Sequence, residues 1–260
     1  MNILDKIVAN KLKEIQRAKA RISYTKLEES EFFNRKCYVF KDFLLDPART
    51  GIIAEFKRKS PSKGIINDKV TVKNVTNGYA AAGASALSVL TDRNFFMGKK
   101  ADLIAARKAN ILPVLRKDFM VDEYQVIEAK AFGADIILLI AAILTPAEIG
   151  KLATLAKSLG LNVLLEVHNL AELERSIHPN LDAIGVNNRN LADFTVSVET
   201  SFQLFEHIPK EFLKISESAI SNVDTIKALK AAGFNGFLIG ENFMKEVDPG
   251  KAMAEFVKGL

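Results

Sequence analysis

The sequence has little of the material that builds disulfide-linked, metal-binding or membrane proteins. It contains one cysteine, Cys37, and three histidines with no ligand spacing between them. A single cysteine excludes an intrachain disulfide, and scattered histidines argue against a metal site. The longest apolar run, residues 136–144, is far too short to cross a bilayer. We therefore expect no metal, no membrane contact and, by default, a cytoplasmic protein.

Blocks of like charge are also missing, although the net charge is +5. Positive and negative side chains are mixed along the chain, and no run of five like charges occurs. This pattern argues against nucleic acid as a partner. A mild excess of lysine and arginine suits an anionic substrate, and an ordinary solvated surface explains it equally well. The apolar share of 48% is enough for a sizeable core.

Three segments share one shape, in which an alanine-rich helix end meets a glycine and an apolar run follows. The glycines are Gly83, Gly133 and Gly233, so their separations are multiples of 25 residues. One strand, loop, helix and loop need about that length. Glycine suits these positions because a helix often ends in a left-handed residue. The spacing predicts repeated strand–helix units.

Filling in the repeat gives eight short apolar runs, which are mostly continuous, as in parallel strands buried on both faces. Helical patterns separate them, and Thr145 before Pro146 is a typical helix start. Eight such units predict an α/β protein with a (β/α)8 TIM barrel. No Gly-x-Gly-x-x-Gly follows the first strand, which argues against an open doubly wound sheet. The expected strands are 51–57, 85–91, 111–117, 135–140, 162–167, 182–187, 212–217 and 236–240.

The first part of the chain precedes the first expected strand. Its apolar positions Ile3, Leu4, Ile7, Val8 and Leu12 recur at helical spacing, which indicates an amphipathic helix rather than a signal peptide. We expect one domain over residues 1–260. Within it, residues 1–48 form a helical extension that covers one end or flank of a barrel formed by residues 49–260.

Charged side chains end several of the expected strands. In this fold the active site lies at the carboxyl ends of the strands. A charge in a buried strand is costly unless it is paired or functional. Structural ion pairs would explain any one of these residues, but convergence of the set on one mouth explains them together. The charged set is Glu55, Lys57, Lys117 and Glu166, and the sixth and seventh runs also end in polar residues that include Asn187 and Glu217.

The last two runs end in SESAIS and LIGEN, whose small residues leave backbone N–H groups accessible. Barrels frequently bind phosphate with the loops after strands seven and eight, because unpaired N–H groups at helix starts attract anions. Each segment alone is more often an ordinary strand-to-helix turn. Together they predict a phosphate site.

The segment IIAEFKRKSPSKG, residues 52–64, resembles the hallmark of indole-3-glycerol-phosphate synthases. The resemblance covers about residues 50–245. It implies ring closure, decarboxylation and dehydration of 1-(2-carboxyphenylamino)-1-deoxyribulose 5-phosphate, a cofactor-free step of tryptophan synthesis. Further matching segments are ALSVLTDRNFFMG (86–98), PVLRKDFMVDEYQ (113–125), LLEVHN (164–169), IGVNNRNL (184–191), SESAI (216–220) and LIGENFM (238–244).

The resemblance also implies roles for the strand-end residues. Lys117 matches an acid that protonates the substrate ketone, and Glu166 and Lys57 match the groups of the dehydration stage. Glu55 matches a carboxylate that orients the lysines, and Asn187 an auxiliary polar residue. Which lysine acts in which step stays open. A lysine acts as a general acid most readily when its pKa is lowered. Burial and a second lysine that faces it can lower the pKa in this way.

Binding residues follow from the same resemblance. Phe96, Phe119 and Leu138 match the apolar pocket for the anthranilate ring, although ordinary core positions would look the same. The positions that match contacts to substrate polar groups, the phosphate included, are Ser60, Arg189, Ser218, Ala219, Gly240 and Glu241. At Glu241 we expect the backbone N–H to bind, because its carboxylate would repel phosphate.

One position departs from the family pattern. The family usually has Glu-Ser-Gly-Ile where this chain has Glu217, Ser218, Ala219 and Ile220. Glycine permits positive φ and a close approach to phosphate, whereas alanine disfavours positive φ. Because the other motifs are intact, we expect Ala219 to have negative φ and its N–H to face the phosphate.

Two other functions fit a phosphate-binding barrel. Phosphoribosylanthranilate isomerase often uses a cysteine and an aspartate, but Cys37 lies upstream of the first strand. A catalytically silent barrel would lack the catalytic positions, which are all present here. We expect a monomer that acts on a small phosphorylated anion.

Overall fold

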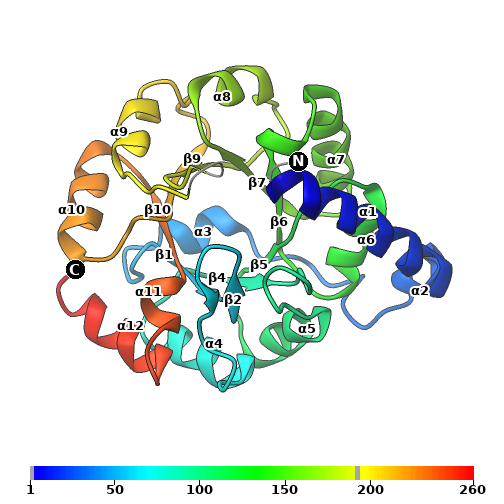
Figure 1. The fold of residues 1–260 in the computed structure, drawn as a ribbon, viewed down its shortest axis with the longest axis horizontal. Coiled ribbons are helices and arrows are strands. Elements are labelled where there is room, and N and C mark those ends of the chain that lie inside the picture. The colour runs from blue at the N-terminus through cyan, green and yellow to red at the C-terminus, as the bar shows by residue number, and fades with distance from the viewer. Residues whose placement is uncertain (1–2, 191–193) are drawn as a thin grey trace.

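The computed structural model describes residues 3–190 and 194–260, so the last residue of the predicted motif 184–191 lies outside it. Within these ranges, eight parallel strands close into a barrel, and helices surround it (Figure 1). The predicted barrel is confirmed, and each predicted run contains one of its strands. In chain order these are β1 (Ile52–Phe56), β4 (Ala86–Leu90), β5 (Val114–Lys117), β6 (Ile136–Ile140), β7 (Asn162–Val167), β8 (Ala183–Asn187), β9 (Leu213–Glu217) and β10 (Gly236–Ile239).

The helices begin and end where local chemistry favours it. Thr145 and Glu148 form a capping box at the start of the helix that begins with Pro146. Gly83, Gly133 and Gly233 have φ of 88°, 88° and 106°, so the predicted left-handed residues are confirmed. The helices between and after the strands are α4 (Val72–Ala81), α5 (Lys100–Ala109), α6 (Glu123–Ala131), η1 (Ala141–Ile143), α7 (Pro146–Ser158), α8 (Leu170–Ser176), α9 (Glu199–Phe205), α10 (Val223–Ala232), α11 (Glu241–Met244) and α12 (Pro249–Val257).

Strand alternation decides which side chains enter the barrel. On β5, Leu115 belongs to the interior cluster, whereas Val114 packs in the outer layer against the helices. Arg116 also faces outward and pairs with Glu128 of α6 at 2.8 Å. The next residue, Lys117, therefore points back into the barrel mouth. The same alternation separates Glu55, which lines the cavity, from Phe56, which packs in the outer layer.

The N-terminal extension covers both ends of the barrel, which is more than the sequence predicted. It contains α1 (Ile3–Arg21), α2 (Tyr24–Glu28) and α3 (Phe40–Leu44). The α3 helix closes the amino ends of the strands, since Phe40 joins the interior cluster and its N–H donates to Asn162, the first residue of β7. At the other end, Ile3, Leu4 and Ile7 of α1 line the cavity at the mouth.

A buried lysine fastens α1 to this mouth. Nζ of Lys11 lies 2.8 Å from a carboxylate oxygen of Asp92 and 2.8 Å from one of Asp118, which follow β4 and β5. Burial alone lowers the pKa of Lys11, but the two carboxylates raise it above its ordinary value. The helix that borders the cavity is therefore held by charges that water does not screen.

The loop after β1 contains a short hairpin that the sequence did not predict. Its strands are β2 (Lys59–Ser60) and β3 (Gly64–Ile65), which pair antiparallel. Oγ of Ser60 accepts the backbone N–H of Lys63 at 3.2 Å. This turn places Ser60 and Ser62 at the edge of the cavity.

Candidate active site

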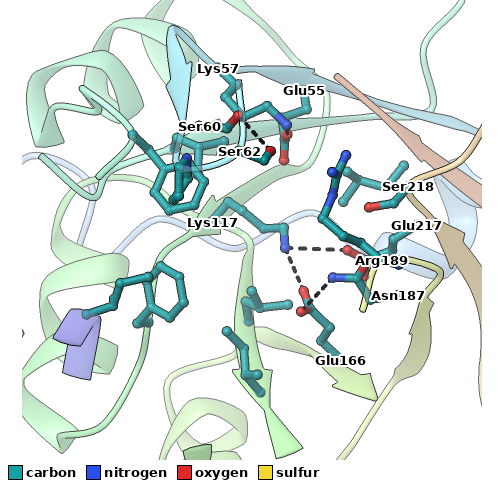
Figure 2. A pocket seen from close by; sticks show the side chains of 18 of the residues that line it. Glu55, Lys57, Ser60, Ser62, Lys117, Glu166, Asn187, Arg189, Glu217 and Ser218 are labelled. Atoms are coloured by element: carbon teal, nitrogen blue, oxygen red, sulfur yellow. Dashed lines mark hydrogen bonds and ion pairs between the residues drawn. The ribbon is translucent and has the colours of Figure 1, made fainter. Parts of the chain in front are cut away.

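The predicted catalytic side chains meet in one cavity at the carboxyl ends of the strands. Nζ of Lys117 donates to Oε2 of Glu166 at 2.7 Å and lies 3.4 Å from Oε2 of Glu217 (Figure 2). Nδ2 of Asn187 donates to the second oxygen of Glu166 at 3.0 Å. Four residues from β5, β7, β8 and β9 therefore converge, because parallel strands of a barrel present their carboxyl ends to the same mouth.

A second lysine–carboxylate pair lies on β1 and the residue after it. Nζ of Lys57 lies 2.9 Å from Oε1 of Glu55, and the hydroxyl of Ser88 on β4 donates to Oε2 at 3.1 Å. Glu55 is buried, with 3% of its surface exposed. The carboxylate is thus held by two partners, which supports its predicted role in orienting a lysine.

The electrostatics of Lys117 differ from the expectation. Burial alone lowers the pKa of Lys117, but Glu166, Glu217 and Glu55 together raise it well above its ordinary value. The prediction of a lysine pKa lowered by a facing lysine is therefore wrong for Lys117. Its near neighbours are carboxylates, and Lys57 is paired with Glu55.

Glu217, the last residue of β9, is a site residue for which no role was predicted from the sequence. It is 2% exposed and lines the cavity. Burial raises its pKa, Lys117 opposes the rise, and Glu166 and Glu55 add to it, so that the pKa reaches about 7. The carboxyl group crosses Gly185 of β8 so closely that a Cβ there would lie 2.2 Å from Oε1. A glycine at position 185 leaves room for this carboxyl group, so Gly185 is the sequence feature that points to Glu217.

Glu166 has the opposite character. Burial alone raises its pKa, but Lys117 and His168 lower it well below its ordinary value. The site therefore holds one firmly ionised carboxylate and one that titrates near neutrality. Two carboxyl groups with pKa values pushed apart are typical of acid–base sites.

The other side of the cavity is apolar. Phe96 and Phe119 are half-buried, with ring centroids 5.9 Å apart, and Leu138 of β6 lies with them on the cavity wall. The three predicted ring-binding residues are thus brought together. Phe194 and the first turn of α1 extend this wall, and neither was predicted from the sequence.

An adjoining cavity lies over the ends of β9 and β10. It shares Glu55, Lys57 and Ser218 with the first cavity and adds the predicted residues Ala219 and Gly240. Gly240 is required here because a Cβ would lie 2.6 Å from a carboxylate oxygen of Glu55. Arg189 and Glu241 border both cavities.

Backbone angles in this region contradict one prediction. Ser218 and Ala219 have φ of 65° and 58°, so the expected negative φ of Ala219 is wrong. A left-handed residue with a Cβ costs about 1–2 kcal/mol. Contacts hold the turn in place: the side-chain amide of Asn188 donates to Oγ of Ser216 at 2.9 Å and to the carbonyl of Ser218 at 3.3 Å.

The side chain of Glu241 is not turned away from this cavity. Its carboxylate oxygens lie 3.6 Å from Nη2 of Arg189 and 3.8 Å from Nζ of Lys63. These are long, partly exposed contacts that contribute little energy. A bound anion can replace the carboxylate as the partner of Arg189.

The described residues contain no candidate metal site and no candidate membrane-spanning helix. No group of three or more metal-binding side chains occurs among residues 3–190 and 194–260. Within the same ranges no helix is long and apolar enough to cross a membrane.

The barrel resembles solved structures of low sequence identity. One is 3-hexulose-6-phosphate synthase from Salmonella typhimurium, with a TM-score of 0.63, 13% identity and coverage of 81% of this chain and 98% of that one. Another is KGPDC from Streptococcus mutans, with a TM-score of 0.59, 11% identity and coverage of 80% and 95%. At these identities the likeness concerns the fold alone.

Sequence relatives carry more information. The chain is 46% identical to indole-3-glycerol phosphate synthase of Bacteroides thetaiotaomicron, over 100% of this chain and 99% of the relative. The namesake proteins of Laribacter hongkongensis and an Acidovorax species are 45% and 42% identical, each over at least 97% of both chains. The model of the family described as indole-3-glycerol phosphate synthase matches residues 4–256. The chain therefore belongs to the indole-3-glycerol phosphate synthase family.

Proposed function

We propose that the protein converts 1-(2-carboxyphenylamino)-1-deoxyribulose 5-phosphate to indole-3-glycerol phosphate, with release of carbon dioxide and water. The observation that carries this proposal is Lys117 held between Glu166 and Glu217, with an apolar wall on one side and the β9–β10 loops on the other. A substrate with an aromatic ring at one end and a phosphate at the other fits this order. The proposal needs no cofactor.

We infer the orientation of the substrate from the same arrangement of an apolar wall opposite the β9–β10 loops. The carboxyphenyl ring lies against Phe96, Phe119 and Leu138, and the phosphate lies near Ser218, Ala219 and the start of α11. Arg189 moves from Glu241 to the phosphate. The ketone then lies between the two ends, within reach of Lys117.

In ring closure, Lys117 gives a proton to the ketone oxygen while the ring carbon that bears the carboxylate attacks. The developing alkoxide is more basic than an amine, so it takes even a tightly held proton. A positive iminium forms, and the carboxylates of Glu55 and Glu166 stabilise it. Loss of carbon dioxide then removes the positive charge.

Dehydration completes the reaction. Glu166, firmly ionised in the free protein, acts as the base that removes the proton. Lys57, next to Glu55, acts as the acid for the departing hydroxide. Asn187 holds Glu166 and contacts the substrate hydroxyl groups. Each lysine thus has its own carboxylate partner and its own stage.

Fluorescence of indole-3-glycerol phosphate tests the proposal directly. We expect turnover by the purified protein, and Lys117→Met should lower kcat by ~10² to 10⁴ or more while substrate still binds. Retention of more than a tenth of the wild-type kcat would remove Lys117 from the acid role. No turnover by the wild-type protein would refute the function.

The phosphate site has a separate test. A crystal soaked in sulfate should hold the anion at the N–H groups of residues 218–220 and 240–242. An anion bound only near Glu55, with none at these loops, would contradict the assignment.

The isomerase alternative is less well supported. Sγ of Cys37 lies 3.7 Å from the carbonyl of Ala134, just before β6 begins, and so at the amino ends of the strands. A reactive pair at the mouth cannot include it. Phosphoribosylanthranilate should therefore be left unchanged by the protein. The monomeric state and the cytoplasmic location stay predictions.

A further inference from the structure

A histidine lies behind the catalytic carboxylate, between it and a second glutamate. His168 follows β7, two residues after Glu166. Its Nε2 lies 3.3 Å from Oε1 of Glu166, and its Nδ1 lies 3.0 Å from Oε2 of Glu172 on α8. The side chain is 11% exposed and borders a polar cavity next to the active site.

Carboxylates on both sides of this ring favour its charged form. A neutral imidazole has one N–H donor and one acceptor nitrogen. Both nitrogens of His168 face carboxylate oxygens, so a neutral ring would direct one lone pair at a carboxylate. Nδ1 is hydrogen-bonded to Glu172, whereas the contact of Nε2 with Glu166 is an ion-pair distance without an aligned hydrogen bond, and two anions at these distances favour the imidazolium. Burial alone lowers the pKa of His168, but Glu166 and Glu172 raise it to about 9, in agreement with the geometry.

The second glutamate is itself held in place. Oε2 of Glu172 also accepts the backbone N–H of His168 at 2.9 Å, and Oε1 accepts the side-chain amide of Asn169 at 3.1 Å. Glu172 therefore cannot turn away without losing three contacts. It fixes the ring from the side opposite Glu166.

The charged groups around the histidine come from several elements. Glu166 on β7 and Glu172 on α8 face the ring directly, and Arg189 after β8 borders the same polar cavity. Beyond Glu166 lies Lys117 of β5, which contacts Oε2. The result is a row of alternating charges that runs Glu172, His168, Glu166, Lys117.

We propose that protonated His168, anchored by Glu172, is a positioning residue that holds Glu166 ionised and in place while Lys117 gives up its proton. When Lys117 becomes neutral, Glu166 loses the attraction of that cation. His168 then supplies the remaining positive charge, so that Glu166 stays a base for dehydration instead of taking up the proton early. The role in catalysis rests on the proposed function.

The protonation state is tested without any turnover. The full chain, labelled in its histidines, is titrated by NMR, and His168→Gln identifies the signal among the three histidines. We expect His168 to titrate with a pKa of about 9. In Glu172→Gln this pKa should fall by at least one unit. Titration of wild-type His168 near 6.5 would overturn the proposal.

The kinetic test separates positioning from folding. In His168→Gln we expect kcat to fall about 10- to 100-fold with KM within threefold, an effect of the size found for side chains that orient metal ligands. The wild-type kcat should also decline above pH 9, and this decline should be missing in His168→Gln. At pH 10 the kcat of His168→Arg, which keeps a cation, should be at least tenfold higher than that of His168→Gln. His207→Gln, at an exposed histidine, is the control and should behave as wild type.

The outcomes distinguish this proposal from the function on which it rests. A wild-type protein that turns over substrate, with His168→Gln within threefold of it at every pH, refutes the histidine role and leaves the function intact. A kcat of His168→Arg at least tenfold above that of His168→Gln at pH 10 supports the charge argument. A wild-type protein without turnover refutes the function, and the NMR titration still decides whether His168 is the cation.

Discussion

Two adjacent residues at the end of β9 have left-handed backbone where the family pattern has glycine at one of them. Ser218 and Ala219 have φ of 65° and 58°. The side chain of Asn188, the residue after β8, holds the turn, so the conformation persists despite its cost. A strained loop at a proposed phosphate site indicates that the turn is needed for function rather than for stability.

Ala219→Gly should therefore stabilise the protein. Glycine adopts positive φ without the steric penalty of a Cβ, and we expect a gain of about 1 kcal/mol, or 2–4 °C in Tm. Differential scanning calorimetry measures the change. The matched control is Ala82→Gly, where φ is −79° and glycine should destabilise. A less stable Ala219→Gly would show that the loop is not strained.

Glu217 makes a prediction about stability and pH. Its pKa rises from the ordinary 4.5 to about 7 on folding, so the folded chain binds more protons between these pH values. Stability is therefore lost as pH rises through this window. In Glu217→Gln the side chain cannot ionise. The free energy of unfolding of this variant relative to wild type should therefore increase by about 2–3 kcal/mol between pH 4.5 and pH 8.

Urea unfolding at pH 4.5, 6 and 8 measures this difference. Glu174→Gln, at an exposed position of α8, is the control and should track wild type at each pH. A constant offset between Glu217→Gln and wild type at all three pH values would contradict a Glu217 pKa near 7.

At the scale of elements, α1 carries both an apolar wall residue and a buried charge. Ile7 lines the cavity one turn before Lys11, which reaches Asp92 and Asp118. The position of the wall therefore depends on an ionic contact with loops after β4 and β5. Removing one member of a buried pair leaves uncompensated charge and costs more than the pair itself is worth.

Lys11→Met should destabilise the protein by about 3–5 kcal/mol, because Asp92 and Asp118 stay buried without their cation. Chemical denaturation gives the free energy of unfolding, and hydrogen exchange should show α1 opening first. Lys19→Met on the same helix is the control, since its pair with Asp122 is partly exposed and should change stability by less than about 1 kcal/mol. Equal effects of the two substitutions would refute the tether.

For the whole molecule, the extension and the barrel share one core. Phe40 and Leu44 of α3 belong to the interior cluster of the strands, and Lys11 joins α1 to the opposite end. The division into residues 1–48 and 49–260 thus separates segments that contact each other at both ends. The extension thus contributes side chains at each end of the barrel.

We therefore expect the chain to unfold in one cooperative transition. Calorimetry should give equal calorimetric and van't Hoff enthalpies, of roughly 180 kcal/mol near 60 °C for a chain of this length. Deletion of residues 1–48 should leave a barrel that does not fold stably. Two separate transitions in the full chain would show that the extension is an independent unit.

Sequence patterns alone predict the barrel, its strand order and most of the site. The 25-residue repeat and the period of two along each strand are local, and barrel closure brings strand ends such as Glu55, Lys117 and Glu166 to one mouth. Their roles came from the family resemblance. The tertiary structure decided the charge states, because the potential at Lys117 sums carboxylates from β1, β7 and β9. It also decided the left-handed Ala219, since the contacts that hold that turn come from Asn188, 31 positions earlier in the chain.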